Sequence, residues 1–252
     1  MSKIYENEKS AESYDTARAL PEHAISTLLN ALRENTPVEH ICSVLDLGGG
    51  TGRISPLLHT LYNCPVYTLD PSIEMLKKGV ARNKDSIHWI RSVAESIPLN
   101  STSVDCVFMS NVYHHLEDPD AAISEIFRVL TSEGNLIIRN GTRETDSEIE
   151  WLKFFPEAIE FDKNRIPRKQ DIIDFTASNG FRCTGCIVVY QQFAQSYLEY
   201  YRKISRRGLS SLLTISDEAF NSGCQRFREW ANTQPPDTPV FEPIDYFFFV
   251  KD

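Results

Sequence analysis

A run of three glycines within VLDLGGGTGR, residues 44–53, constrains the fold of this chain more than any other feature. Apolar residues precede the glycines as in a buried strand, and the apolar residues Ile54, Leu57, Leu58 and Leu61 follow at helical spacing. The segment therefore predicts a strand, a tight turn and the start of a helix. Glycines suit such a turn because a ligand can approach the backbone without meeting a Cβ, and because some positions require a positive φ. The amides that begin the helix would then face the ligand.

The spacing of these glycines distinguishes between ligands. A dinucleotide-binding G-x-G-x-x-G would require a third glycine where this chain has Arg53, and no Lys-Ser or Lys-Thr follows as in a phosphate-binding loop. The glycines instead alternate behind an acidic residue, which resembles motif I of the class I S-adenosylmethionine (SAM) dependent methyltransferases. A glycine turn of another α/β protein is the alternative. SAM has no phosphates, and an acidic residue suits the amine of its methionine part. The resemblance assigns to cofactor binding Asp46, Gly48, Gly49, Gly50 and Gly52.

A second acidic residue ends the next expected strand. PVYTLD, residues 65–70, reads as a buried strand, and Asp70 follows Gly52 by 18 residues. A carboxylate at this distance can accept hydrogen bonds from both ribose hydroxyls of a nucleoside. Asp70 would alternatively cap the following helix, although Ser72 could fill that role. The stretch DPSIEML resembles the same superfamily, and the resemblance places Pro71 or Ser72 against the adenine edge.

A third strand is predicted over SIHWIRSV, residues 86–93, and AESIPL follows it. In the methyltransferase subgroup that this chain resembles, the corresponding stretch reads D-A-E-x-L-P-F and brackets the adenine. The resemblance therefore assigns Ala94, through its backbone amide, and Glu95 to the cofactor site. Val93 replaces the Asp that usually takes the adenine amino group, and Glu95 could instead be a solvated loop acid.

The fourth predicted strand and its exit are SVDCVFMSNVYHHLED, residues 103–118. Open parallel sheets bind ligands at the carboxyl ends of their strands, which places Asn111 at the cofactor. The prolines of the N/D/S-P-P-Y/F motif of nucleic-acid and protein-glutamine N-methyltransferases are missing here. His114 and His115 follow, and either could be a general base because histidine titrates near neutrality. His115 matches the family pattern better, and a helix-start role without chemistry is the alternative.

Two further segments resemble the same family. Residues 10–29 resemble the N-terminal segment of small-molecule methyltransferases, in which a Tyr and an Arg fold over the cofactor; by position these are Tyr14 and Arg18. Arg18 could bind a carboxylate of the cofactor or substrate, or lie exposed on an amphipathic helix. Residues 125–138, EIFRVLTSEGNLII, resemble a helix–turn–strand of the family in which Ser132 and Glu133 replace Pro and Gly, which predicts a looser turn.

The five matching segments resemble most the subgroup that includes the ubiquinone/menaquinone-biosynthesis C-methyltransferases. The resemblance implies an α/β, Rossmann-like, doubly wound seven-stranded sheet that is mostly parallel, with its last strand antiparallel. We expect a single methyltransferase domain over residues 1–252. It would comprise an N-terminal helical cap (1–40), a SAM-binding core (41–142) and a C-terminal half (143–252).

The C-terminal half determines the substrate. PIDYFFFV, residues 243–250, is expected to be the seventh strand, so residues from about 194 to 238 form a helical insertion between the last two strands. Such a long insertion at a binding edge is usually a lid or substrate wall. Tyr197 and Tyr201 share a helix face there and could line an aromatic pocket or pack the lid onto the core. A basic cluster, Arg202–Arg207, could bind an anionic substrate or be a solvated face.

Composition excludes several classes of partner. A net charge of −9 and a pI of about 5.2 argue against nucleic-acid binding, which requires a basic surface. Neither an apolar signal-peptide core nor a run long enough to cross a bilayer is present, so we expect a cytoplasmic protein with no membrane partner. Six scattered cysteines include one pair, Cys183 and Cys186, on an expected strand. A second ligand pair is missing, so we expect no metal.

These observations predict a SAM-dependent methyltransferase that acts on a small molecule and releases S-adenosyl-L-homocysteine (SAH). Methyl transfer from a sulfonium is an in-line displacement in which the protein supplies alignment and desolvation. Three alternatives stay open: a SAM-binding regulator or partner protein without catalysis, a nucleotide-dependent oxidoreductase, and a nucleic-acid methyltransferase. The acceptor atom and the oligomeric state do not follow from the sequence.

Overall fold

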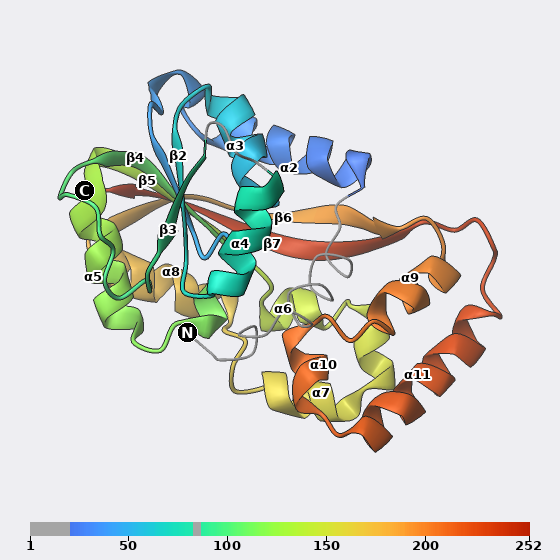
Figure 1. The fold of residues 1–252 in the computed structure, drawn as a ribbon. Coiled ribbons are helices and arrows are strands. Elements are labelled where there is room, and N and C mark those ends of the chain that lie inside the picture. The colour runs from blue at the N-terminus through green and yellow to red at the C-terminus, as the bar shows by residue number, and fades with distance from the viewer. Residues whose placement is uncertain (1–20, 83–86) are drawn as a thin grey trace.

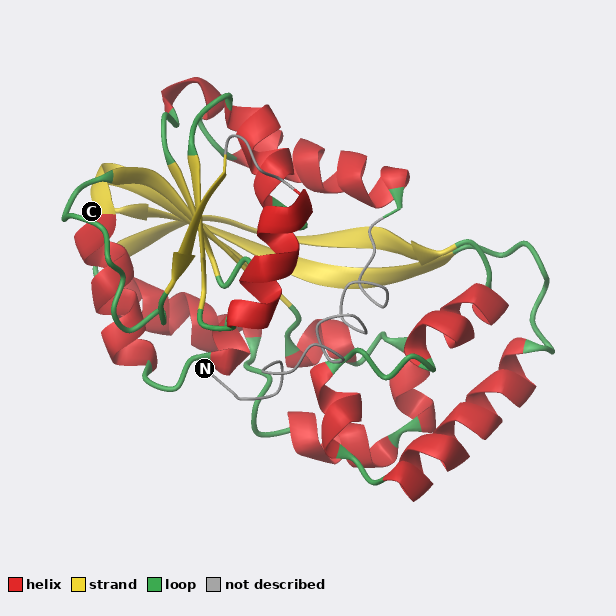
Figure 2. Ribbon diagram, in the orientation of Figure 1, coloured by secondary structure: helices red, strands yellow, loops and turns green. Residues whose placement is uncertain are grey.

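The structure is a computed structural model that describes residues 21–82 and 87–252. Its centre is a seven-stranded sheet with the order β3-β2-β1-β4-β5-β7-β6 (Figures 1 and 2). β7 runs antiparallel to both of its neighbours, and the other strands are parallel, as the family resemblance implies. The strands are β1 Val44–Leu47, β2 Val66–Asp70, β3 Ile87–Arg91, β4 Val104–Ser110, β5 Leu130–Asn140, β6 Phe181–Ala194 and β7 Val240–Lys251.

Helices cover both faces of this sheet (Figure 2). On one face lie α2 (Glu22–Asn35), the 3₁₀ helix η2 (Val38–His40), α3 (Ser55–Tyr62) and α4 (Ile73–Arg82), and on the other lie α5 (Pro119–Val129) and α8 (Lys169–Ser178). None of the helices in the described ranges combines the length and the apolar character needed to cross a bilayer.

Burial on both faces explains the continuous apolar runs in the strands. In β7, Phe247 and Phe249 belong to the core on the α5 and α8 side, whereas Tyr246 and Phe248 belong to the core on the α2 and α3 side. Successive side chains point to opposite faces of a strand, so a strand covered on both sides needs apolar residues at every position. The run DYFFFV is therefore an interior strand.

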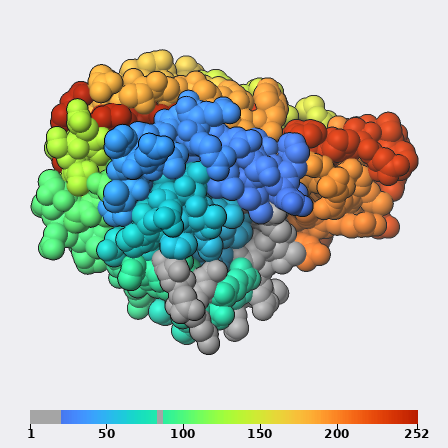
Figure 3. All heavy atoms as spheres, turned by 90° about the horizontal axis from the view of Figure 1, so that it is seen from above, coloured from blue at the N-terminus to red at the C-terminus, as the bar shows by residue number. Residues whose placement is uncertain are grey.

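A separate group of helices packs around a third core. It contains the 3₁₀ helix η4 (Glu150–Phe154), α7 (Pro156–Asp162), α9 (Tyr197–Ile204), α10 (Ser210–Thr214) and α11 (Asp217–Ala231). We call these five helices the helical unit. The long strands β6 and β7 extend towards it, and its C-terminal part (red) projects from the body of the molecule in Figure 3. The expected insertion supplies α9 to α11, while η4 and α7 come from the segment after β5.

The tyrosines of the insertion belong to this third core. Tyr200 is fully buried, and Tyr197 and Tyr201 pack edge-on against Trp230 and Phe227. Aromatic edge-to-face contacts of this kind stabilise a core beyond the area that they bury. Tyr197 and Tyr201 therefore pack within the helical unit and do not line the cavity between this unit and the sheet, whereas the sequence leaves open an aromatic pocket or packing of the lid onto the core.

The first residues of β5 depart from the family pattern. Strand β5 begins at Leu130, directly after the helix, and Glu133 has a φ of 60°. A positive φ is unfavourable for a residue with a Cβ, and glycine is the residue that usually adopts it. Glu133 thus stands in a conformation that suits the glycine it replaces.

Candidate cofactor and acceptor site

The glycine turn after β1 has the backbone geometry that its sequence predicts. Gly48, Gly50 and Gly52 have φ angles of 70°, 59° and 66°. A Cβ on Gly49 would lie 2.5 Å from Thr68 Cγ2, and one on Gly52 would lie 2.2 Å from the Trp89 ring, so these two glycines are required by packing. A Cβ on Gly50 would meet only the Asp70 carboxylate, at 3.9 Å. Gly50 is therefore the point at which a ligand can approach the main chain.

Asp46 supports this turn from the interior. Its carboxylate is buried and accepts a hydrogen bond of 2.6 Å from Ser55 Oγ, which in turn accepts one of 2.8 Å from Thr68 Oγ1. Burial raises the pKa of Asp46 to about 6, because a charged carboxylate loses its hydration in the protein interior. The contact expected between Asp46 and the methionine amine stays a prediction.

Asp70 lies beside the open glycine. One carboxylate oxygen accepts the Gly50 amide at 3.0 Å, and the other accepts the Ser72 amide at 2.8 Å. Ser72 Oγ accepts the Met75 amide at 3.3 Å, so Ser72 is the N-cap of α4. The capping role that was the alternative for Asp70 is therefore taken by Ser72. A carboxylate has about four acceptor positions, and two of those on Asp70 are left for a ligand. Burial raises the pKa of Asp70 to about 6.

The segment after β3 reaches the same edge of the sheet. Ala94 is buried, while Val93, which replaces the family aspartate, is exposed. Glu95 Oε1 accepts the backbone amides of Glu117 and Asp118, at 3.1 and 3.4 Å. Glu95 therefore connects the loops that follow β3 and β4, a role that neither sequence interpretation included.

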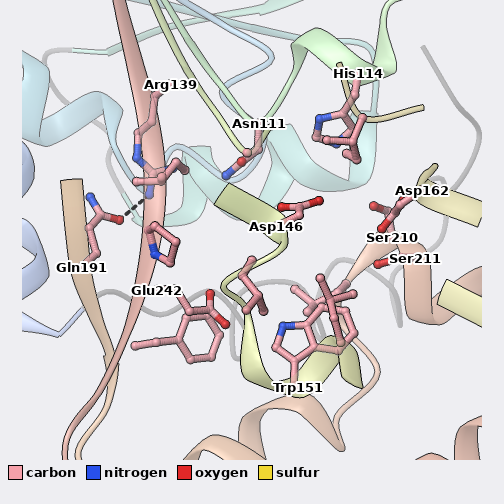
Figure 4. A pocket seen from close by; sticks show the side chains of 18 of the residues that line it. Asn111, His114, Arg139, Asp146, Trp151, Asp162, Gln191, Ser210, Ser211 and Glu242 are labelled. Carbon is pink, nitrogen blue, oxygen red and sulfur yellow. Dashed lines mark hydrogen bonds between the residues drawn. The ribbon is translucent and has the colours of Figure 1, made fainter. Parts of the chain in front are cut away.

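A cavity of about 120 Å³ lies between the carboxyl ends of the strands and the helical unit (Figure 4). Its polar lining residues on the sheet side include several from the ends of strands or the turns that follow them: Arg53, Asn111, His114, Arg139 and Gln191. Those on the helical side include Trp151, Asp162, Ser210 and Ser211. The cavity thus combines the predicted edge of the sheet with residues that sequence reasoning did not single out.

Of the two candidate histidines, His114 lines the cavity and His115 does not. Their rings lie 4.3 Å apart, within the 3₁₀ helix η3, Tyr113–His115. His114 Nδ1 lies 3.2 Å from Asn140 Oδ1, and the Asn140 amide nitrogen donates to the Gly141 carbonyl at 2.7 Å. Because Asn140 thus presents its oxygen to the ring, this contact favours the tautomer of the neutral ring in which Nδ1 carries the proton and Nε2 the lone pair.

Arg139 is the most unusual residue of the cavity and was missed in the sequence. Only 5% of it is exposed, although it lies at the end of the apolar strand β5. Its guanidinium donates to Ser110 Oγ at 2.8 Å, to Tyr246 Oη at 3.0 Å and to Gln191 Oε1 (Figure 4). The signal available in the sequence was a single arginine at the binding edge of a buried strand, LIIRN.

The other predicted site features are not among the described residues that line the cavity. Tyr14 and Arg18 fall outside the described residues. In the basic cluster, Lys203 donates to the Phe193 carbonyl and Arg207 pairs with Asp217, and neither lines the cavity. All six cysteines are free, and the described residues contain no group of three potential metal ligands.

The comparisons with known proteins agree with this geometry. Residues 45–138, from β1 to β5, match the family model described as a methyltransferase domain. This segment of the chain is therefore similar to the methyltransferase domains of that family. An uncharacterized methyltransferase of Mycobacterium tuberculosis is 34% identical over 148 residues, which are 58% of this chain and 56% of that one. The ubiquinone/menaquinone biosynthesis C-methyltransferase UbiE of Rubrivivax gelatinosus is 32% identical over 118 residues, or 47% and 45% of the two chains.

A solved methyltransferase structure extends the likeness beyond the core. Phosphoethanolamine N-methyltransferase 2 of Haemonchus contortus, in complex with phosphomonomethylethanolamine and SAH, superposes with a TM-score of 0.63 at 20% identity. The match covers 98% of this chain and 58% of that one, and at this identity it establishes the fold alone. The chain spans about half the length of the curated relatives that it matches.

Proposed function

We propose that this chain transfers the methyl group of SAM to a small-molecule acceptor. The observation that carries the proposal is the open backbone at Gly50 beside the Asp70 carboxylate, next to a polar cavity at the same edge of the sheet. The turn suits a ligand that approaches the main chain, and the carboxylate suits a ligand with two neighbouring hydroxyls. A phosphate-free nucleoside with a charged amino-acid part meets both requirements.

The residues present fit SAM in their chemistry. Asp70 has acceptor positions for the ribose hydroxyls, Gly50 leaves the main chain accessible, and Asn111 and Ala94 stand at the same strand ends. When bound, SAM supplies a methyl group that is already activated by its positive sulfur. The protein's contribution is then to align the acceptor opposite the sulfur and to exclude water.

The size of the cavity favours a small acceptor. A cavity of about 150 Å³ holds one benzene ring, and the cavity of this chain has about 120 Å³. The overall charge of −9 also disfavours nucleic acid as the acceptor. We therefore place a small metabolite, or one small group of it, in this cavity.

His114 is our candidate for the general base. Asn140 favours the ring tautomer in which Nε2 can take a proton from an acidic O–H, N–H or C–H of the acceptor. His114→Gln should lower turnover about 10²-fold or more and leave SAH affinity unchanged. His115→Gln is the matched control, since His115 lies beside His114 but outside the cavity lining. Equal losses in both variants, or none in either, would contradict the assignment.

Two measurements test the function as a whole. Calorimetry with SAH should give one binding event per chain, and tight NADH binding without SAH binding would instead indicate the oxidoreductase. Incubation with methyl-labelled SAM and a metabolite extract should then yield a labelled small molecule, identified by its mass. SAH binding with no labelled product would favour the remaining alternative, a SAM-binding regulator.

A further inference from the structure

A positive charge is buried at the end of β5 without a negative partner. Arg139 is 95% buried, and its three hydrogen-bond acceptors are uncharged: Ser110 Oγ, Tyr246 Oη and Gln191 Oε1. Burial raises the pKa of Tyr246, so its phenol is neutral at physiological pH. Within residues 21–82 and 87–252, no carboxylate forms an ion pair with Arg139. The hydrogen bonds orient the guanidinium but do not neutralise it.

Such an arrangement is unfavourable in the absence of a ligand. An uncompensated charge in a protein interior is strongly destabilising, and an apolar residue of similar size would pack more favourably. A guanidinium has five N–H groups, and the three acceptors use one each on Nε, Nη1 and Nη2. Two N–H groups, one on each terminal nitrogen, are thus left without an acceptor among the described residues. Arg139 lines the cavity, so a ligand there can reach them.

The carboxylates of the cavity do not fill this role. Asp162 pairs with Arg165 on the side of the helical unit, and Figure 4 shows it across the cavity from Arg139 and Gln191. Glu242 accepts the hydroxyl of Tyr200. Asp146, the third carboxylate of the cavity, does not pair with Arg139 either. Among the described residues, Arg139 therefore has no carboxylate partner in the cavity.

We propose that Arg139 binds an anionic group, a carboxylate or a phosphate, of the methyl acceptor. The proposal rests on the proposed function and names its substrate class. Two parallel N–H groups of a guanidinium suit both anions, which accept them in a bidentate manner. Ser110, on the neighbouring strand β4, and Gln191, on β6 beyond β7, hold the guanidinium, and His114 lines the same cavity. The anion would fix one end of the acceptor and leave its other end to the base.

The methionine carboxylate of SAM is a second source of the same chemistry. Arg139 lies on β5, two strands away from β1 and its glycine turn, which corresponds to about 10 Å at the usual strand spacing. This distance favours the acceptor as the source, and the experiment below separates the two sources.

The test is calorimetry with inorganic phosphate and with benzoate, each with and without saturating SAH. The wild-type protein should bind at least one probe, and Arg139→Met should weaken that binding at least about tenfold. Arg182→Met is the matched control, because Arg182 is an exposed arginine at the start of β6 that pairs with Asp252. The affinity for SAH should be equal in all three proteins.

Arg139→Lys covers the case in which the methionine variant does not fold. This variant keeps the buried positive charge but lacks the planar guanidinium that binds an anion through two N–H groups. It should therefore bind the same probe several-fold more weakly than wild type. The proposal is overturned if neither probe binds to the wild-type protein, or if every Arg139 variant that folds binds them as wild type does. It is also overturned if Arg139→Met or Arg139→Lys weakens SAH but not 5′-methylthioadenosine, which lacks the amino-acid part. If the wild-type protein binds phosphate or benzoate but does not bind SAH, the result would instead refute the proposed function.

Discussion

At the scale of single residues, the two buried carboxylates beside the glycine turn have opposite uses. Asp46 points into the interior and bonds to Ser55, whereas Asp70 bonds to the open turn itself. Burial raises the pKa of each to about 6. Both are therefore mostly ionised at neutral pH, and burial of the charge lowers the stability of the folded protein. The charge of Asp46 holds Ser55 in the interior, whereas that of Asp70 lies at the open turn, where a ligand can bind.

Asp70→Ala should weaken SAH binding about tenfold or more, because a carboxylate that accepts two hydroxyls contributes charge-assisted hydrogen bonds. Binding to wild type should also weaken as the pH falls below 6, where the carboxyl of Asp70 takes up a proton and loses acceptor capacity. Calorimetry across this range measures both effects. Asp174→Ala, on the outer helix α8, is the control, and an Asp70→Ala variant with wild-type affinity would refute the ribose assignment.

For Asp46 we predict an effect on the stability of the protein and its pH dependence. Its pKa is 3.8 in the unfolded chain and about 6 in the folded one, so its favourable contribution exists below pH 3.8 and is lost as the pH rises through 6. This shift corresponds to about 3 kcal/mol at neutral pH. Asp46→Asn should therefore raise the free energy of unfolding above pH 6, with a gain that shrinks towards pH 4. Urea unfolding at the two ends of this range tests it, and a gain independent of pH would contradict it.

At the scale of the elements, the beginning of β5 carries local strain. Glu133 has a φ of 60°, which costs a residue with a Cβ about 1 kcal/mol. Glu133→Gly should therefore stabilise the protein by about 1 kcal/mol in urea unfolding. The neighbouring exposed residue gives the matched control, Ser132→Gly, which should be neutral or destabilising. A gain in the control equal to that in Glu133→Gly would show that strain at Glu133 is not the cause.

Individual strands and the glycine turn could be predicted from the sequence because each of their signals is local, whereas the plan of the whole sheet came from the resemblance to a known family. The glycine turn, the acidic end of β2 and the apolar run of β7 each lie within about ten residues, and each has a physical reason that one segment contains. The cavity could not be predicted in the same way. Arg139 meets Gln191 across 52 residues of sequence and Tyr246 across 107. Only the strand order, with β7 between β5 and β6, brings these side chains together.

At the scale of the whole molecule, the two parts of the proposed site rest on different cores. The glycine turn and Asp70 stand on the sheet, whereas Trp151, Ser210 and Ser211 are presented by the helical unit, which has a core of its own. Such a division lets the helical unit change with the acceptor while the cofactor half keeps its geometry. It also means that damage to one core should affect the two halves of the site unequally.

Phe227 is the residue with which to test this division. It is fully buried at the centre of the helical unit, where its ring contacts Tyr200, Tyr201 and Trp230. Phe227→Ala should destabilise the unit by about 3–5 kcal/mol. We expect hydrogen exchange to accelerate in α9 and α11 and methyl transfer to fall, while SAH affinity stays near that of wild type. Phe247→Ala, an equal truncation in the core of the sheet, should weaken SAH binding as well. If Phe227→Ala lost SAH binding to the same extent, the two cores would unfold as one, and the site would not be divided between them.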